Sequence, residues 1–330
     1  MRVLVLGAYG LIGNNVVRAA LAANWEVVAF ERRSRRKAGL QGLPVEISPG
    51  TPSDPDALSR SMAGCDVVFH TLAYNPPNGL RTPQRLVEAR EHVTRVLRAA
   101  GHARIGRLVY TSAACTIGGA DSPGQLPDEW NRYRLGSIPH PFWDAKLLQE
   151  EAVLAFGREK LIPVIVVNPA EVLGPNDFDL QAARPLIDIA RRGRRQYLPG
   201  TASIADAEDV AQGHLKAATL GRPGERYILA GHNLTRREIA ATMAYASKRP
   251  APDRPADLHR LERLARFSER VSCLGQPDRL FPLTYQVAAA LLPGWYDSSK
   301  ARQELEYTNR PLLDTCRATL GWLASVRMLR

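Results

Sequence analysis

The sequence has few cysteines and no long apolar run, and both absences restrict what the protein is. No stretch approaches the ~20 apolar residues of a membrane span, and because the chain starts directly on a predicted core strand we expect no signal peptide. The cysteines form no C-x-x-C pair and have no neighbouring His cluster, so we expect no disulfide framework and no metal site. We predict a cytoplasmic protein with no membrane partner. The four cysteines are Cys65, Cys115, Cys273 and Cys316.

The chain also lacks internal repeats, low-complexity segments and the residue pattern of a nucleic-acid surface. Its net charge of +11 comes mostly from arginine, in runs at 32–37, 191–195 and 254–270. A nucleic-acid site would combine such runs with exposed aromatic residues or a recognition helix, and these runs have neither. We interpret them as solvated helix faces and expect no nucleic-acid partner.

What the sequence does contain is a glycine-rich turn at its amino terminus. Residues 2–6 (RVLVL) are typical of a strand buried on both faces, and residues 11–23 have the apolar spacing of a helix. Gly7, Gly10 and Gly13 therefore lie on a strand-to-helix turn, where the backbone approaches a pyrophosphate closely. We predict a dinucleotide site, against the alternative of a tight turn that only packs.

Glu31 and the arginines after it bear on which nicotinamide nucleotide binds. Glu31 ends a second predicted strand (26–30), where an acidic residue accepts hydrogen bonds from the adenosine ribose hydroxyls. Arg32, Arg33 and Arg35 would instead attract a 2′-phosphate. Because Glu31 can rotate towards Arg33, we expect NADP(H) to be slightly favoured over NAD(H).

Strands and helices alternate along the first half of the chain, in the order of a parallel sheet with crossover helices. After residue 168 helices dominate, with one short strand at 226–230. We predict an α/β fold: a Rossmann-type doubly wound parallel sheet in residues 1–168, to which segments near 203–230 return. Residues 169–330 should form mainly a smaller, mostly helical substrate lobe. The other predicted elements are helices at 55–62, 83–100, 141–158 and 311–324, and strands near 45 and at 66–70, 107–112 and 163–168.

Seven segments, in order along nearly the whole chain, carry a family resemblance: GAYGLIG, VVFHTLA, RLVYTS, VVNPAEVLGPND, IADAEDVAQGHL, ERYILAGHNLT and YDSSKARQELEY. They resemble the landmarks of the extended short-chain dehydrogenase/reductases, the NAD-dependent epimerase/dehydratase family. The most similar branch holds hopanoid-associated sugar epimerases, dihydroflavonol reductases and 3β-hydroxysteroid dehydrogenases. The resemblance implies a Rossmann domain with a small C-terminal lobe. It leaves a homodimer open, since members often dimerise through helices that correspond to 83–100 and 141–158.

The resemblance also places the chemistry, and here the sequence departs from the family. Members carry a Ser or Thr where this chain has Ala113, and a Tyr-x-x-x-Lys where it has FWDAK (142–146). Lys146 remains on one helix face with Phe142 and can hold the nicotinamide ribose. A phenyl ring has no proton to give, and losing a positioned acid/base costs ~10²- to 10⁴-fold. The predicted cofactor-binding residues are Gly7, Tyr9, Gly10, Leu11, Ile12, Gly13, Glu31, Arg32, Leu72, Ala73, Lys146 and Pro169.

Two other residues could take over acid/base work beside Lys146. Glu171 follows the strand that faces the nicotinamide; partly desolvated and close to Lys146, it could act as a general base with a raised pKa. The alternative is a surface carboxylate paired with an arginine. Tyr133, in an ill-defined loop, could fold back over the site. We therefore predict Lys146, Glu171 and Tyr133 as catalytic residues, with His140 and His70 as further candidates; His70 is expected mainly to pack.

Three functions remain open on these observations. The first is an NAD(P)-binding enzyme that acts on a small ketone, alcohol or sugar-like metabolite with non-standard acid/base groups. The second is a non-redox cyclase, lyase or isomerase on the same scaffold, and the third is a nucleotide-sensing protein without turnover. We favour an enzyme with a small-molecule substrate, because the loops at 74–77, 130–133 and 141–143 are suited to enclosing an apolar ligand.

Overall fold

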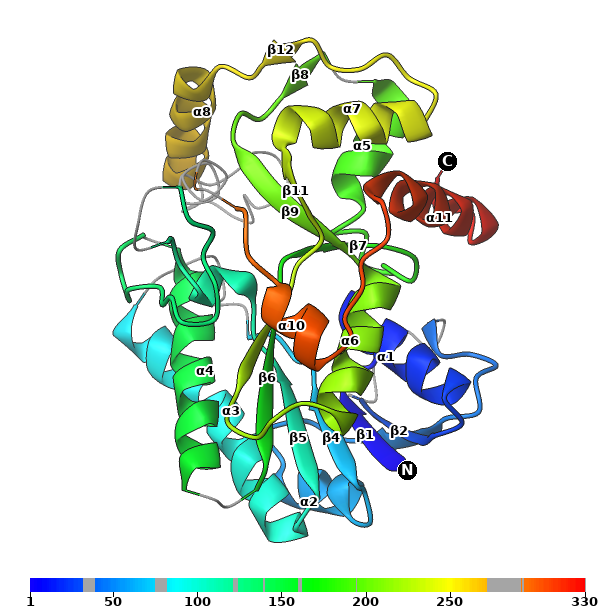
Figure 1. Ribbon diagram of the computed structural model, residues 1–330, viewed down its shortest axis with the longest axis vertical. Coiled ribbons are helices and arrows are strands. Elements are labelled where there is room, and N and C mark those ends of the chain that lie inside the picture. Colours follow the sequence, from blue (N-terminus) through cyan, green and yellow to red (C-terminus); the bar gives the residue numbers. More distant parts are fainter. Residues whose placement is uncertain are drawn as a thin grey trace.

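A computed structural model describes residues 1–31, 39–74, 82–120, 124–138, 140–159, 162–193, 195–271, 292 and 294–329. In Figure 1 a large sheet and its covering helices fill the lower part of the molecule. Two small sheets and the helices α5, α7, α8 and α11 lie above it. Within the described ranges, no helix combines the length and the apolarity needed to cross a membrane.

The large sheet has seven strands in the order β3-β2-β1-β4-β5-β6-β10, and every pair in it is parallel. The chain reverses its direction of winding between β1 and β4, which is the point where open α/β sheets bind ligands. The predicted Rossmann-type doubly wound parallel sheet is therefore confirmed. The strands are β1 (Arg2–Leu6), β2 (Glu26–Glu31), β3 (Glu46–Pro49), β4 (Val67–His70), β5 (Arg107–Thr111), β6 (Val164–Pro169) and β10 (Arg226–Leu229).

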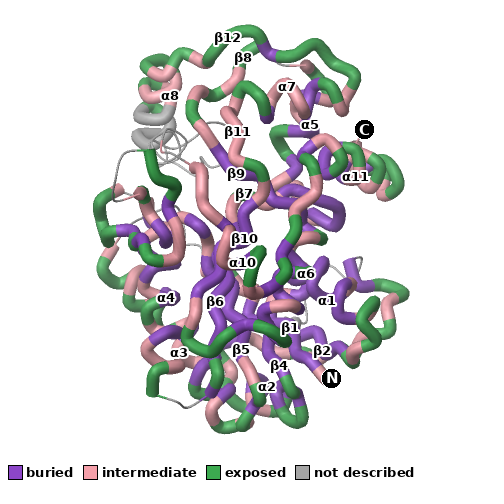
Figure 2. The backbone as a smooth tube through the Cα atoms, in the orientation of Figure 1, coloured by how far each residue is buried: buried purple, intermediate pink, exposed green. Residues whose placement is uncertain are grey.

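Helices cover both faces of this sheet, so most of its strands are buried (Figure 2). The exception is the edge strand β3, most of which is exposed. Because side chains alternate along a strand, Val3 and Val5 pack in one cluster with α1 and α6, whereas Leu4 and Leu6 pack in another with α2, α3 and α4. The covering helices are α1 (Leu11–Ala22), α2 (Pro55–Met62), α3 (Pro83–Ala103), α4 (Pro141–Arg158) and α6 (Ala207–Thr219).

Local signals set the ends of these helices. Helix α2 has the predicted bounds, because Asp54 caps it by accepting hydrogen bonds from the backbone N–H groups of Asp56 and Ala57. Helix α4 also has its predicted bounds. Helix α3 runs three residues beyond its predicted end, to Ala103, and stops at Arg104 in the left-handed conformation (φ +49°).

The second half of the chain contains more strands than predicted, so the expectation of one short strand after residue 168 is wrong. These strands are short, and β11 reads HNLT, with little apolar character to predict it. They pair across long sequence separations that no local pattern records. The domain boundary at residue 168 stays a prediction. The further elements are β7 (Glu171–Leu173), α5 (Arg184–Arg192), β8 (Gln196–Tyr197), β9 (Thr201–Asp206), β11 (His232–Thr235), α7 (Arg236–Ala246), β12 (Arg254–Pro255), α8 (Leu258–Val271), α10 (Ser299–Glu304) and α11 (Leu312–Ser325).

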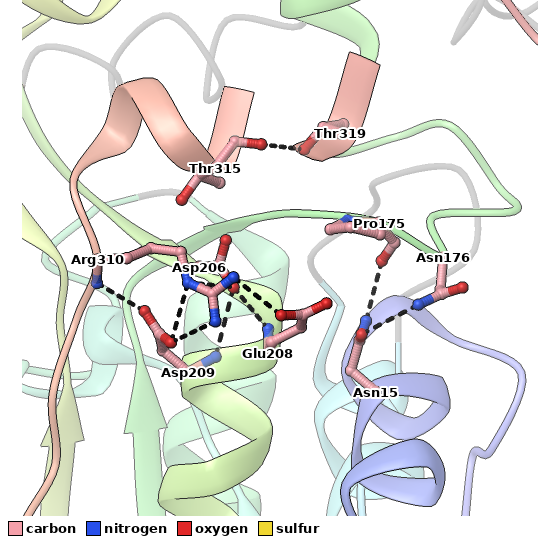
Figure 3. Close-up of polar contacts among 9 residues, drawn as sticks. All are labelled: Asn15, Pro175, Asn176, Asp206, Glu208, Asp209, Arg310, Thr315 and Thr319. Carbon is pink, nitrogen blue, oxygen red and sulfur yellow. Dashed lines mark hydrogen bonds and ion pairs between the residues drawn. The ribbon is translucent and has the colours of Figure 1, made fainter. Parts of the chain in front are cut away.

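An arginine ties the segment before α11 to the start of α6 (Figure 3). Arg310 donates its backbone N–H to Asp209 at 2.7 Å, and its guanidinium bonds to Asp209 at 2.9 Å and to Glu208 at 2.8 Å. The same guanidinium lies 3.6 Å from Asp206, which caps α6. This cluster holds the C-terminal helix against the Rossmann layers.

Candidate active site

Three glycines turn the chain from β1 into α1. Gly7 has a φ of +92°, a conformation that L side chains rarely adopt. A Cβ on Gly13 would lie 2.1 Å from the Gly7 carbonyl oxygen and 2.6 Å from Thr71 Oγ1. A Cβ on Gly10 would meet only the Gly7 oxygen, at 3.5 Å, so the backbone of Gly10 has an open side. A pyrophosphate cradle requires one glycine for the tight turn, one that lets the backbone approach the phosphates, and one that lets the helix pack closely on the strand.

The amino end of α1 supplies hydrogen-bond donors for an anion. Its N-cap, Gly10, offers no side-chain cap, and the first turn carries no acidic residue. The backbone N–H groups there, next to the partly buried Leu11 and Ile12, fit a pyrophosphate. One turn further on, Asn15 bonds to the Pro175 carbonyl oxygen and to Asn176, which ties the cradle to the loop after β7 (Figure 3).

The other predicted cofactor residues lie at the same edge of the sheet. Leu72 and Ala73 follow β4, the strand beside β1 at the winding reversal. Glu31 ends β2, one residue beyond the pairing of Phe30 with Leu6. Arg32, Arg33 and Arg35 lie outside the described residues. The structure adds a residue that the sequence reading missed: Thr71, whose hydroxyl donates to the Leu6 carbonyl oxygen at 2.8 Å and braces the glycine turn.

Lys146 lies next to Phe142, in a buried position on α4. Its ammonium donates a hydrogen bond to the Thr111 carbonyl oxygen at 2.9 Å and lies 6.0 Å from the centre of the Phe142 ring. Burial lowers the pKa of Lys146 to about 8, although the nearby Cys115 and Glu150 act in the opposite direction. Lys146 therefore stays mainly charged at neutral pH, beside a ring that cannot exchange a proton.

A buried histidine fixes the strand end that holds Lys146. His214 Nδ1 lies 2.7 Å from the Val210 carbonyl oxygen, and its Nε2 lies 2.8 Å from the Thr111 hydroxyl. Burial lowers the pKa of His214 to about 4, so the ring is neutral. Since a carbonyl only accepts, Nδ1 carries the proton and Nε2 accepts from Thr111. This arrangement locks Thr111 with its carbonyl directed at Lys146.

A cavity of about 340 Å³ opens beside these residues. Ala113 and Phe142, where the resemblance led us to expect the family's Ser and Tyr, are both on its wall, as is Pro169 at the end of β6. The wall also includes residues that the sequence reading missed: Ser203 on β9, Arg236 at the start of α7, and Tyr296. For Ser203 alone the sequence contains a signal: the alternation of residue types in TASIAD fits a strand that has Ser203 on one face. Nothing comparable marks Arg236 or Tyr296.

Glu171 lies on this wall but not in the environment expected of a buried base. Its side chain is 52% exposed, and its carboxylate pairs with the Arg236 guanidinium at 2.6 Å. The expected desolvation of Glu171 is wrong, because the chain leaves the large sheet after β6 and Glu171 begins β7, which pairs with β9 and leaves half of the side chain exposed. The alternative reading, a surface carboxylate held by an arginine, describes what the structure shows.

Tyr133 lines a neighbouring cavity of about 310 Å³ instead of the one beside Phe142. Its hydroxyl lies 3.0 Å from the Ile138 carbonyl oxygen and 3.2 Å from an Asp144 carboxylate oxygen. The Ile138 N–H donates back to it at 3.3 Å. The phenol thus fixes its own loop, and the expectation that Tyr133 folds over the site is wrong.

The two candidate histidines have low basicity. His70 is fully buried edge-on to Tyr110, with 5.2 Å between ring centres, and burial lowers its pKa to about 3. His140 is on the wall of the first cavity and stacks on Trp143; burial lowers its pKa to about 4. Both rings are therefore neutral at physiological pH.

A larger cavity of about 860 Å³ adjoins the first and is bordered mainly by residues of the C-terminal half of the chain. The two share Phe142, Glu171 and Arg236 on their walls. Most residues that border the larger cavity are apolar, many of them on β7, α5 and α7. The border also contains the charged or amide side chains of Glu171, Gln181, Arg184, Asp188, Gln196 and Arg236. The apolar residues include Leu173, Pro185, Ile189, Leu198, Ile239 and Met243.

Comparison with known proteins defines the class. The sequence model of the NAD dependent epimerase/dehydratase family matches residues 3–230, and the chain belongs to this family. It is 31% identical to a putative dihydroflavonol 4-reductase of Synechocystis sp., over 91% of this chain and 88% of the relative. It is 30% identical to sterol demethylase protein B of Methylococcus capsulatus, over 92% and 93%. The crystal structure of a nucleoside-diphosphate-sugar epimerase from Pseudomonas aeruginosa superposes with a TM-score of 0.83 at 25% identity, covering 100% of this chain and 99% of that one.

Proposed function

We propose that the protein is an NAD(P)-dependent oxidoreductase that acts on a ketone or alcohol with a largely apolar body, using acid/base groups other than the family's Tyr and Ser. The observation that carries the proposal is the position of Lys146. This lysine is buried and held by the Thr111 carbonyl, at the same sheet edge as the glycine cradle and beside a cavity lined by Ala113 and Phe142.

The residues present fit a nicotinamide dinucleotide. The backbone around Gly10 would bind the pyrophosphate, and Lys146 would hold the nicotinamide ribose. Tyr9, Leu72, Ala73 and Pro169 would enclose the cofactor. When bound, the nicotinamide supplies or accepts a hydride.

The chain's own residues set the conditions at the reacting carbon. Ala113 offers only a methyl group to the cavity, and Phe142 adds an apolar ring that excludes water. The charge of Lys146, in a site of low dielectric, favours negative charge on a substrate oxygen. Glu171 keeps Arg236 in place where the two cavities meet.

The larger cavity supports the substrate class. Its volume of about 860 Å³ suits a drug-sized molecule. Most residues on its wall are apolar, and the charged and amide side chains among them can orient the polar end of such a ligand. Two relatives are named for a dihydroflavonol and a sterol, both of which have apolar ring systems. A screen of aromatic, alicyclic and long-chain carbonyl compounds, followed by nicotinamide absorbance, tests this class.

The cradle can be tested separately from turnover. Gly10→Ala should weaken nucleotide binding about tenfold or more, since a methyl group would enter the approach face, and should leave the melting temperature unchanged. Gly13→Ala should lower both the nucleotide affinity and the melting temperature, because its Cβ would lie 2.1 Å from the Gly7 carbonyl oxygen. Gly321→Ala, where a Cβ meets nothing within 4 Å, is the matched control. Unchanged binding in Gly10→Ala would refute the proposed cradle.

The preference for NADP(H) over NAD(H) is part of the proposal and rests on the arginines that follow Glu31. Titrating NAD⁺ and NADP⁺ at fixed salt tests it: tighter NAD⁺ binding that Glu31→Ala abolishes would refute it.

We also propose a homodimer through α3 and α4, testable by sedimentation, and a cytoplasmic location, testable by fractionation.

A second candidate function is nucleotide sensing without turnover. Ala113 and Phe142 favour it, because a protein that only binds nucleotide needs no proton donor beside the nicotinamide. This candidate predicts tight nucleotide binding with no absorbance change for any carbonyl compound. Conversion of a substrate without net absorbance change would instead point to an isomerase, cyclase or lyase.

A further inference from the structure

Two residues on the wall of the first cavity have hydroxyl groups that form no hydrogen bond with the described part of the chain. One is Ser203, on β9, a residue that is 1% exposed. Its Oγ forms no hydrogen bond with the part of the chain that the structure describes. A buried hydroxyl without a partner costs free energy, so a partner from outside the chain would stabilise it.

The other hydroxyl belongs to Tyr296, in the segment before α10. The backbone of Tyr296 is fixed on both sides, since its N–H donates to Asn233 Oδ1 at 3.1 Å and its carbonyl accepts from Asn233 Nδ2 at 3.0 Å. Its ring packs against a buried cluster that includes Ile117 and Ile228. Its hydroxyl bonds to none of the described residues. The side chain is therefore positioned firmly while its polar end stays available.

Tyr296 also lies between the two smaller cavities and is on the wall of both. The first holds Ala113, Phe142 and Ser203. The second is bordered by exposed residues, among them Arg134 and Ser137, and so communicates with solvent. Burial, with Cys115 and Glu171 nearby, raises the pKa of Tyr296, so its phenol is neutral and able to donate at physiological pH.

We infer that Tyr296, assisted by Ser203, binds the reacting oxygen of the substrate and supplies the proton that Phe142 cannot. Tyr296 is a neutral donor with no competing partner among the described residues, and Ser203 is a second hydroxyl-bearing residue on the same cavity wall. In this assignment the pair takes the role of the family's Tyr and Ser, from segments in the C-terminal half of the chain.

The step balances as a carbonyl reduction and rests on the proposed function for its hydride source, the reduced nicotinamide nucleotide. As a hydride adds to the carbonyl carbon, the π electron pair of the C=O bond moves onto oxygen and takes the phenolic proton. The product is an alcohol. The Tyr296 phenolate then regains a proton from solvent that enters the second cavity.

Infrared spectroscopy of a bound ketone tests the hydrogen bond without turnover. The probe is isotope-labelled tetralone, an apolar ketone, bound to the full-length protein with and without oxidised nucleotide. In the wild type its carbonyl band should shift to lower frequency. Tyr296→Phe should abolish most of this shift, and Ser203→Ala should reduce it. The exposed Tyr245→Phe is the matched control and should keep it.

The same variants should separate binding from chemistry in the reduction assay. Tyr296→Phe should lower kcat by ~10²-fold or more with a smaller change in KM, because a positioned proton donor is lost while the ring still packs. A wild-type band without a shift, or a shift that persists in Tyr296→Phe, would overturn the inference. So would a loss that appears in Tyr133→Phe instead. If the protein binds no nucleotide, the proposed function is refuted, but the hydrogen bond from Tyr296 is still tested, because the ketone band is also measured without nucleotide.

Discussion

Replacing Glu150 by Gln should destabilise the protein by about 3–5 kcal/mol, because it leaves the buried Arg226 guanidinium without its counter-charge. Both side chains are buried, and Arg226 Nε lies 2.8 Å from Glu150 Oε1. The second carboxylate oxygen accepts hydrogen bonds from Thr116 and Asn168, each at 2.7 Å. The pair therefore joins α4, β6 and β10 to the turn that carries Ala113.

The distance sets the size of the effect. Two unit charges 2.8 Å apart attract by about 6 kcal/mol at an effective dielectric of about 20. Glutamine keeps the shape of the side chain and part of its hydrogen bonding, so the loss in the free energy of unfolding should be smaller than this attraction. For 330 residues the entropy of unfolding is roughly 0.7 kcal/mol/K, and the melting temperature should fall by about 4–7 °C.

The assay is thermal and urea unfolding in a double-mutant cycle with Arg226→Met. Each single variant should be strongly destabilised, and the double variant should cost at least about 2 kcal/mol less than the sum of the two, since it leaves no unpaired charge. Lys216→Met, which removes an exposed partner of Glu306, should cost under about 1 kcal/mol. Additive effects, or a loss below about 1 kcal/mol for Glu150→Gln, would refute the electrostatic argument.

Three further predictions concern the site and the fold. Phe142→Tyr combined with Ala113→Ser should not raise kcat on a substrate found in the screen, because the proton comes from elsewhere; a rise of about tenfold would show an impaired standard reductase. Arg310→Met should destabilise the fold by ~1.5–3 kcal/mol through lost charge-assisted bonds to Asp209, with exposed Arg317→Met nearly neutral in the same melting experiment. Burial lowers the pKa of His214 to about 4, so in acid the unfolded chain binds a proton that the folded protein excludes. The free energy of unfolding should therefore fall by up to about 3 kcal/mol as the pH drops from about 6.5 to 4. In His214→Gln the urea midpoint should depend less on pH over the same range.

The elements of the Rossmann layers were determined by the sequence. The run RVLVL forms β1, Gly7 and Gly13 occupy positions that only glycine tolerates, and Pro55 and Pro141 begin helices at the predicted residues. These features depend on neighbours within a few positions, so a local pattern records them. The relation of Phe142 to Lys146 belongs here too, because a spacing of four fixes two side chains on one helix face.

Only the tertiary structure decided which side chains surround the cavity. Glu171 pairs with Arg236 across 65 positions, and Tyr133 turns back onto its own loop. Tyr296 and Ser203 reach the cavity from strands and segments whose pairing no local pattern records. Burial and partner choice depend on how distant segments pack, and a residue's position in the sequence carries neither. The sequence therefore specified the glycine turn and the helix face that Phe142 shares with Lys146, whereas the packing of the C-terminal half set which other side chains line the cavity.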